Sequence, residues 1–304
     1  MDTSLAQPSI LAPLPPLGRS LTFRLAPDAD PRPAIRRLRD GFSLDWGVIG
    51  FGEPLIRALG QEFKALRTFP GFSGPACTVP STQQALWVLL RGQERGTLFD
   101  FTDRVEAFLN GAFLLDDALD TFLYAGGRDL TGYEDGTENP KGEAVADAAL
   151  VSVSKGSDGG AAGDGMAGSS FVAVQRWVHD LHRFRQFPPE RRDETIGRRA
   201  DTNAEIADAP PSAHVKRTAQ ESYEPPAFMV RRSMPWATAH EQGLEFIAYG
   251  NSLDQFERVL RRMVGLEDGI TDALFAFSRP VTGGYYWCPP VAGSRLDLRR
   301  LGKF

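Results

Sequence analysis

Hydrophobic and polar positions along the chain form two blocks that predict similar elements. Period-two alternation and short apolar runs predict strands, while apolar positions three or four residues apart predict helices. In the first block we expect strands at residues 21–25, 46–51, 85–90 and 113–124, and helices at 31–39, 54–59 and 100–109. In the second we expect strands at residues 170–178, 228–230 and 244–249, and helices at 188–199 and 254–264.

The order strand–helix–strand–strand–helix–strand can be laid over both blocks, with two extra helices intruding. This is the order of a ferredoxin-like unit. We therefore predict an α+β fold of two ferredoxin-like units, whose antiparallel sheets pack against each other and carry peripheral helices. The first unit is expected at residues 1–150 and the second at residues 151–304.

Two segments show neither period. Residues 1–17 are rich in proline and predict an extended arm. Residues 155–170 contain six glycines and almost no large apolar side chain, which is typical of a flexible connector.

Charge and cysteine content narrow the class of protein. The 304 residues include 34 basic and 39 acidic side chains, a net charge of −5, which gives no electrostatic reason to bind nucleic acid. Apolar runs such as residues 85–90 are much shorter than a membrane span. The N-terminus shows no secretory pattern, and the distant pair Cys77 and Cys288 forms no disulfide framework. We therefore expect a cytoplasmic protein with reduced thiols.

The first candidate for chemistry is the segment from Gly132 to Pro140. Gly132 and Gly136 flank Asp135, and Asn139-Pro140 closes the run. Glycines permit tight turns and a close approach of the backbone to another group. Such a segment can present one carboxylate to a confined site, although by itself it is most simply a surface turn.

Histidine and arginine supply the other candidates. His214 follows two prolines and is, by itself, most simply a structural residue, although imidazole is also the commonest protein ligand of haem iron. His179 and His182 are three positions apart and favour a solvated or capping role over a metal site. Arg231 and Ser233 would share one face of a strand. An arginine on the core-facing side needs a partner charge or a ligand, although an edge strand whose arginines, Arg231 and Arg232, both reach water is the simpler interpretation.

Together, in this order, these motifs resemble the dye-decolourising peroxidase family, most closely its bacterial B-type branch. Gly132 to Pro140 fits that family's Gly-x-x-Asp-Gly-Thr-Glu-Asn-Pro run, His214 falls at its proximal haem ligand, and Arg231 falls at its distal arginine. Ser233 stands where some members carry asparagine. The likeness covers nearly the whole chain and extends to residues 7–11, 168–171, 176–180 and 282–286.

The resemblance implies a haem-dependent peroxidase with one non-covalent haem b per chain, held in the second unit. It would reduce hydrogen peroxide through a high-valent iron–oxo intermediate and oxidise bulky aromatic or dye-like donors. The resemblance implies His214 as the iron ligand, and Asp135, Arg231 and Ser233 as catalytic residues. The other implied cofactor contacts are Arg198 to a propionate, Asn139 and Glu138 near the haem edge, and Asp272 as the carboxylate partner of His214.

Further expectations concern partners and electron transfer. Homo-oligomers, dimers or larger, are expected from the resemblance. Trp177, Trp236 and Tyr133 are candidate electron relays from surface donors, although aromatic residues usually belong to the core. Some relatives use C-terminal tails to enter encapsulin shells, but the basic segment 294–304 lacks a spacer and favours ordinary packing.

Three alternative functions stay open at this point. The protein could carry haem, or remove iron from it as a deferrochelatase does, with the same residues at the iron. It could be an encapsulin cargo protein. A non-haem metal enzyme that uses His179 and His182 is the least favoured, since the sequence shows no third ligand near them.

Overall fold

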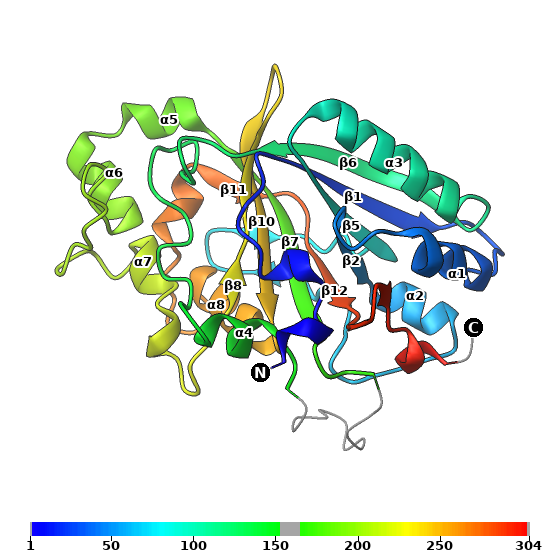
Figure 1. Cartoon of the computed structure of the whole chain (residues 1–304). Coiled ribbons are helices and arrows are strands. Elements are labelled where there is room, and N and C mark those ends of the chain that lie inside the picture. Colours follow the sequence, from blue (N-terminus) through cyan, green and yellow to red (C-terminus); the bar gives the residue numbers. More distant parts are fainter. Residues whose placement is uncertain (1, 153–164, 303–304) are drawn as a thin grey trace.

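The computed structural model describes residues 2–152 and 165–302 and contains two similar units (Figure 1). The first unit follows the predicted order. Its elements are β1 (Leu17–Leu25), α1 (Arg32–Gly41), β2 (Gly47–Phe51), α2 (Glu53–Ala58), the short pair β3 (Phe72–Ser73) and β4 (Thr78–Val79), β5 (Leu86–Gly92), α3 (Arg95–Leu109) and β6 (Phe113–Phe122).

The second unit repeats the plan with extra helices. A short helix α4 (Ala144–Ala149) precedes it. Its elements are β7 (Ser170–His179), α5 (Leu181–Gln186), α6 (Pro189–Ile196), α7 (His214–Arg217), β8 (Val230–Arg231), β9 (Met234–Ala237), β10 (Gln242–Gly250), α8 (Asp254–Met263), β11 (Ser278–Pro280) and β12 (Gly284–Cys288).

Strand order confirms the repeat. The first unit has the order β6-β1-β5-β2, and the second has β12-β7-β10-β8, with β9 continuing β8 along β10. In both units, the last and first strands of the unit are neighbours, followed by the third and the second, and the pairs are antiparallel. The two sheets are joined at one edge, where Phe51 of β2 pairs with Trp287 of β12.

Alternation along the strands places each sheet between two apolar layers. In β5, Trp87 and Leu89 belong to a buried cluster shared with Val172 and Tyr249 of the second sheet. The intervening Val88 belongs to the cluster that includes the helices of the first unit. The sheets therefore pack face to face, and α1 and α3 lie on one outer side while α5 to α8 lie on the other (Figure 1).

A buried acid lies between the sheets. The carboxylate of Glu245, from β10, accepts a hydrogen bond of 2.9 Å from Ser20 Oγ of β1, and Trp87 Nε1 donates to the same hydroxyl at 2.9 Å. Arg176 Nε lies 4.0 Å from the second carboxylate oxygen of Glu245. Burial raises the pKa of Glu245 to about 7, assisted by Asp117 and opposed by Arg176 and Ser20.

The N-terminal segment differs from the predicted extended arm. It forms two 3-10 turns, Thr3–Leu5 and Pro8–Ile10. The buried amide of Gln7 bonds the N–H and the carbonyl of Ile49 at 2.8 and 2.9 Å, and the carbonyl of Pro289 at 3.1 Å. The segment is therefore fixed where the two units join.

Other differences are smaller. Helix α3 begins five residues before the predicted 100, and α5 was not expected. Of the predicted connector 155–170, residues 155–164 lie outside the described part of the chain. Near the C-terminus, β13 (Val291–Ala292) pairs with β14 (Arg295–Leu296), and Leu298 and Leu301 are buried. Among the described residues, we find no helix with the length and apolar character of a membrane span.

Glu245→Gln should increase the stability of the protein at alkaline pH. The folded pKa is raised above the unfolded value, so the wild type loses stability as pH rises from the unfolded pKa through about 7. Each pKa unit between the folded and unfolded values corresponds to about 1.4 kcal/mol of unfolding free energy. Thermal unfolding should therefore show a higher melting temperature for the variant than for the wild type above neutral pH, and similar melting temperatures near pH 4. The exposed Glu241→Gln serves as the control, and equal responses of both variants would contradict the prediction.

Candidate functional site

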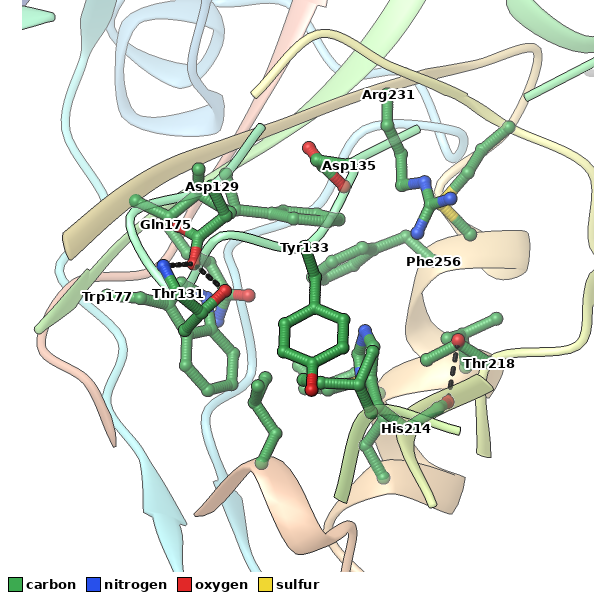
Figure 2. Close-up of a pocket in the computed structure, with 18 of the residues that line it drawn as sticks. Asp129, Thr131, Tyr133, Asp135, Gln175, Trp177, His214, Thr218, Arg231 and Phe256 are labelled. Carbon is green, nitrogen blue, oxygen red and sulfur yellow. Dashed lines mark hydrogen bonds between the residues drawn. The ribbon is translucent and has the colours of Figure 1, made fainter. Parts of the chain in front are cut away.

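A cavity of about 940 Å³, including its mouth, lies on the outer face of the second sheet (Figure 2). Trp177 and Phe246 line it from the sheet, and Phe256, Val259 and Leu260 line it from α8. Mostly apolar walls with a few polar groups are typical of a site for a small molecule or cofactor.

His214 enters this cavity as the first residue of α7. Its Nδ1 lies 2.8 Å from Oδ2 of Asp272, whose side chain is fully buried. The second oxygen of Asp272 accepts from the backbone N–H of Leu274 at 2.8 Å. The predicted pairing of His214 with Asp272 is therefore confirmed. Because a carboxylate accepts, Nδ1 donates, which leaves Nε2 as an acceptor for the cavity.

Backbone geometry requires a glycine at position 197, where the chain packs against the helix that begins at His214. Gly197 ends α6 with a φ of 91°, and a Cβ there would lie 2.1 Å from Cγ1 of Val215. Further support comes from the N–H of Ala273, which donates to the carbonyl of Ser212 at 2.8 Å. The segment with His214 is therefore held against the turn that carries Asp272.

The predicted glycine-flanked loop brings Asp135 into the cavity lining. Gly132 and Gly136 have φ values of 91° and 73°, and a Cβ on Gly136 would lie 2.9 Å from Nδ2 of Asn139. Oδ1 of Asp135 accepts from the N–H of Gly136 at 2.8 Å. The glycines thus let the loop turn sharply beside Asn139.

Arg231 lines the same cavity from β8. Asn139 holds its backbone by two bonds: Oδ1 accepts from the N–H of Arg231 at 2.8 Å, and Nδ2 donates to its carbonyl at 3.0 Å. Nε of Arg231 is buried, with no hydrogen-bond partner within residues 2–152 and 165–302. In Figure 2, Asp135 and Arg231 lie on one side of the cavity and His214 lies on the other. A buried guanidinium nitrogen without a partner requires a ligand or solvent.

Five predicted residues lie outside the described lining of the cavity: Asn139 and Asp272, which bond Arg231 and His214, and Ser233, Arg198 and Glu138. Ser233 is buried, and its Oγ accepts from the N–H of Ile247 at 3.4 Å. Arg198 forms an ion pair with Glu138 and donates to the carbonyl of Asn203 at 2.8 Å. Ser233, Arg198 and Glu138 are therefore not brought together with His214, Asp135 and Arg231 in the described wall.

His179 has partners that the sequence did not indicate. His179 is buried and lines the cavity; its Nδ1 lies 2.6 Å from Ser278 Oγ and its Nε2 lies 3.2 Å from Oδ1 of Asp129. The solvated or capping role expected for it is wrong, because the ring is buried and both of its nitrogens contact side chains. Asp129 belongs to the same loop as Asp135, three residues before Gly132, and this proximity is the signal that could have drawn attention to it.

Electrostatics keeps Asp129 ionised. Burial by itself would raise its pKa, but the hydrogen bonds from His179 and from Thr131 outweigh burial and lower it. Thr131 donates to Oδ2 through its hydroxyl at 2.5 Å and through its N–H at 2.8 Å.

The weakest alternative, a metal site of His179 and His182, finds no support in the geometry. His182 is exposed on α5, where its Nε2 contacts Gln186 at 2.9 Å. Within the two described ranges, we find no group of three or more His, Cys, Asp or Glu side chains that could hold a metal ion.

The candidate electron relays differ in their relation to the cavity. Trp177 and Tyr133 line it, and the Tyr133 hydroxyl donates to Asp193 at 2.6 Å. Trp236 is buried behind Trp177 and donates to its carbonyl at 3.1 Å. Their role in electron transfer stays a prediction.

Comparison with known proteins gives one consistent family. Residues 126–293 match the family model described as Dyp-type peroxidase, C-terminal. A dye-decolorizing peroxidase of Rhodococcus erythropolis is 31% identical over 250 residues, which cover 80% of this chain and 71% of the relative. One from Mycolicibacterium paratuberculosis is 29% identical, over 93% of this chain and 83% of the relative.

Solved structures agree with this result. A DypB variant from Rhodococcus jostii in complex with haem is 25% identical and has a TM-score of 0.82, over 92% of this chain and 95% of that one. A dye-decolorizing peroxidase from Bacteroides thetaiotaomicron is 26% identical with a TM-score of 0.83, over 99% of this chain and 100% of that one.

Asn139→Ala should destabilise the protein by about 1–3 kcal/mol, because the backbone N–H and carbonyl of Arg231 lose their bonds to the Asn139 side chain. Urea denaturation measures the loss. Asn110→Ala, at an exposed position, is the control. If both variants unfold alike, Asn139 does not hold Arg231 in the way described.

Proposed function

Since the chain belongs to the Dyp-type peroxidase family and is a haem-dependent peroxidase, we propose that the cavity holds one haem b with His214 as the iron ligand. The observation that carries this proposal is the His214–Asp272 pair, which leaves Nε2 in an apolar cavity opposite the buried Nε of Arg231. Neutral imidazole is a common axial ligand of haem iron.

The side chains present fit this cofactor. Apolar side chains from β10 and α8 suit a flat macrocycle, and Nε2 of His214 is an acceptor suited to iron. The buried Nε of Arg231 suits an oxygen-bearing ligand on the other side. Arg198 remains the candidate for a propionate, because its guanidinium already binds a carboxylate, that of Glu138.

Bound haem would supply a redox-active iron that peroxide oxidises and that donor molecules reduce. The Asp272 carboxylate would make His214 more electron-rich, because it accepts the Nδ1 proton. Asp135 would take a proton from one peroxide oxygen and return it to the other as water leaves. Arg231 would stabilise the negative charge that develops during this transfer.

The remaining predicted residues would act by positioning. Asn139 would hold Arg231 through its two backbone bonds, and Glu138 would orient Arg198. Ser233 would act indirectly, through its contact with the backbone of β10. Bulky aromatic or dye-like donors would deliver electrons from the surface, because many of the side chains that line the cavity are buried.

A haem carrier or a deferrochelatase-like protein is the less favoured function. The relatives are named as peroxidases. Arg231 and Asp135 also give the cavity two charged groups suited to peroxide, which simple transport of haem would not require.

The location and assembly proposed from the sequence are a cytoplasmic homo-oligomer. Support for oligomers comes from β6, whose edge exposes Leu114 and Leu115. An encapsulin role is less favoured, because Leu296, Leu298 and Leu301 are buried rather than part of a free tail.

His214→Ala should abolish the Soret absorption of bound haem, and added imidazole should restore part of it by replacing the missing ligand. His240→Ala, which changes an exposed histidine, is the matched control and should bind haem like the wild type. Retention of an unchanged Soret band in His214→Ala would contradict the assignment of the ligand.

Arg231→Leu and Asp135→Asn should keep haem but slow the reaction with peroxide, each by about 10²-fold or more. Stopped-flow absorption after one equivalent of peroxide measures this rate. Glu134→Gln, a neutralised carboxylate beside Asp135, serves as the control. Wild-type rates in both variants would show that neither side chain assists the transfer of protons or charge.

A further inference from the structure

The wall of the cavity contains a buried histidine, and a depression of the protein surface lies on the other side of it. His179 ends β7 and lines the haem cavity on one side. On the other side it lines a surface depression together with Ser278 and Phe277. Since only 4% of His179 is exposed, it separates the two spaces rather than standing in either of them.

A chain of hydrogen bonds crosses this wall. Ser278 Oγ lies 2.6 Å from Nδ1 of His179, on the side of the depression, and Nε2 lies 3.2 Å from Oδ1 of Asp129. Asp129 itself lines the cavity. Each link is within the distance needed for proton transfer between heavy atoms.

The donors along the chain are arranged for inward transfer. Asp129 is an acceptor when ionised, so Nε2 of His179 carries the proton that faces it. Nδ1 then accepts from the hydroxyl of Ser278. A proton that arrives at Nδ1 can therefore be matched by release of the Nε2 proton to Asp129. A change of tautomer, in which the proton on Nδ1 is moved to Nε2, then returns the ring to its first state for the next transfer.

Two hydrogen bonds from Thr131 prepare Asp129 to accept a proton from His179. Its hydroxyl and N–H both donate to Oδ2, so the carboxylate is oriented and favoured in its ionised form. These bonds and the His179 bond lower its pKa despite the opposing effect of burial. A proton that reaches Asp129 is consequently passed on readily.

The peroxidase reaction requires a supply of protons to the cavity. Reduction of one hydrogen peroxide to two waters consumes two protons and two electrons. Electrons come from the donor molecules of the peroxidase reaction. The protons consumed must reach the cavity from solvent, through its mouth or across its wall, and Asp135 can only move a proton that is already there.

We propose that His179 and Asp129 form a proton-transfer pair that carries protons from the surface depression into the peroxidase cavity. This inference rests on the proposed function of the cavity. It gives the two acid–base roles to different residues. Asp135 moves protons between the oxygens of the peroxide, and the His179–Asp129 pair replaces the protons that the reaction consumes.

Charged groups around the depression fit an entry for protons. On the cavity side, Asp129 bonds His179, and the titratable or charged side chains that line the depression with it are Asp180, Arg183, His240, Glu241 and Arg279. Their mixed signs give exchangeable sites near Ser278 without a single strong partner for the imidazole on that side.

The first test uses the cofactor-free protein and needs no activity. Long-range ¹⁵N–¹H NMR of the histidine rings should show His179 protonated at Nε2 and unprotonated at Nδ1 near neutral pH, and Asp129→Asn should alter this state. A His179 protonated at Nδ1 alone would overturn the proposal, because no proton would then stand between the ring and Asp129.

The second test compares His179→Gln and Asp129→Asn with the control His182→Gln, which changes an exposed histidine of α5. With haem content matched by absorption, both test variants should consume peroxide about 10²-fold more slowly. The residual rate should rise with the concentration of a small buffer acid between about pH 5 and 8. The control should follow the wild type in rate and in pH profile.

The outcomes separate the two proposals. A wild type that binds haem but does not consume peroxide would overturn the proposed function. An active wild type with test variants that match His182→Gln, or that lose rate without any response to buffer, would overturn the proton-transfer pair alone. If His179→Gln fails to take up haem, the isosteric Asp129→Asn decides the kinetic test.

Discussion

The site depends on the hydrogen bond between His214 and the buried carboxylate of Asp272. An ionised carboxylate without solvent is costly unless its oxygens are bonded, and here His214 and the N–H of Leu274 each bond one oxygen. The backbone N–H of Asp272 in turn donates to the carbonyl of Met263, at the end of α8. One buried charge thus ties the helix that carries the histidine to the helix that forms the apolar wall, and the direction of Nε2 follows from it.

The opposite side of the cavity is assembled from both halves of the sequence. The loop with Asp135 follows the last strand of the first unit, yet Asn139 from that loop bonds the backbone of Arg231 in the second. Because the sheets pack through their inner faces, the outer face of the second sheet remains for the cavity. The first unit therefore stabilises the second sheet and also supplies acidic residues to the site.

Acidic side chains from one loop serve different parts of the cavity because their partners differ. Asp135 bonds the N–H of the next residue and faces the side of Arg231, whereas Asp129 is held by Thr131 and faces His179. Positive φ at Gly132 lets the chain turn between these two aspartates. The loop thus presents one carboxylate on the side of Arg231 and the other at the wall next to the surface depression.

The sequence by itself determined the order of strands and helices, the glycine turn around Asp135, and the residues that carry the family resemblance, because periodicity and turn chemistry are local properties. It also indicated Asp272 as the partner of His214. Only the tertiary structure decided that Ser233 and Arg198 lie off the cavity wall and that His179 lies in it. Those outcomes depend on which side chains meet when β11, β7 and the loop near Asp129 come together, and contacts between distant segments leave no period in the sequence.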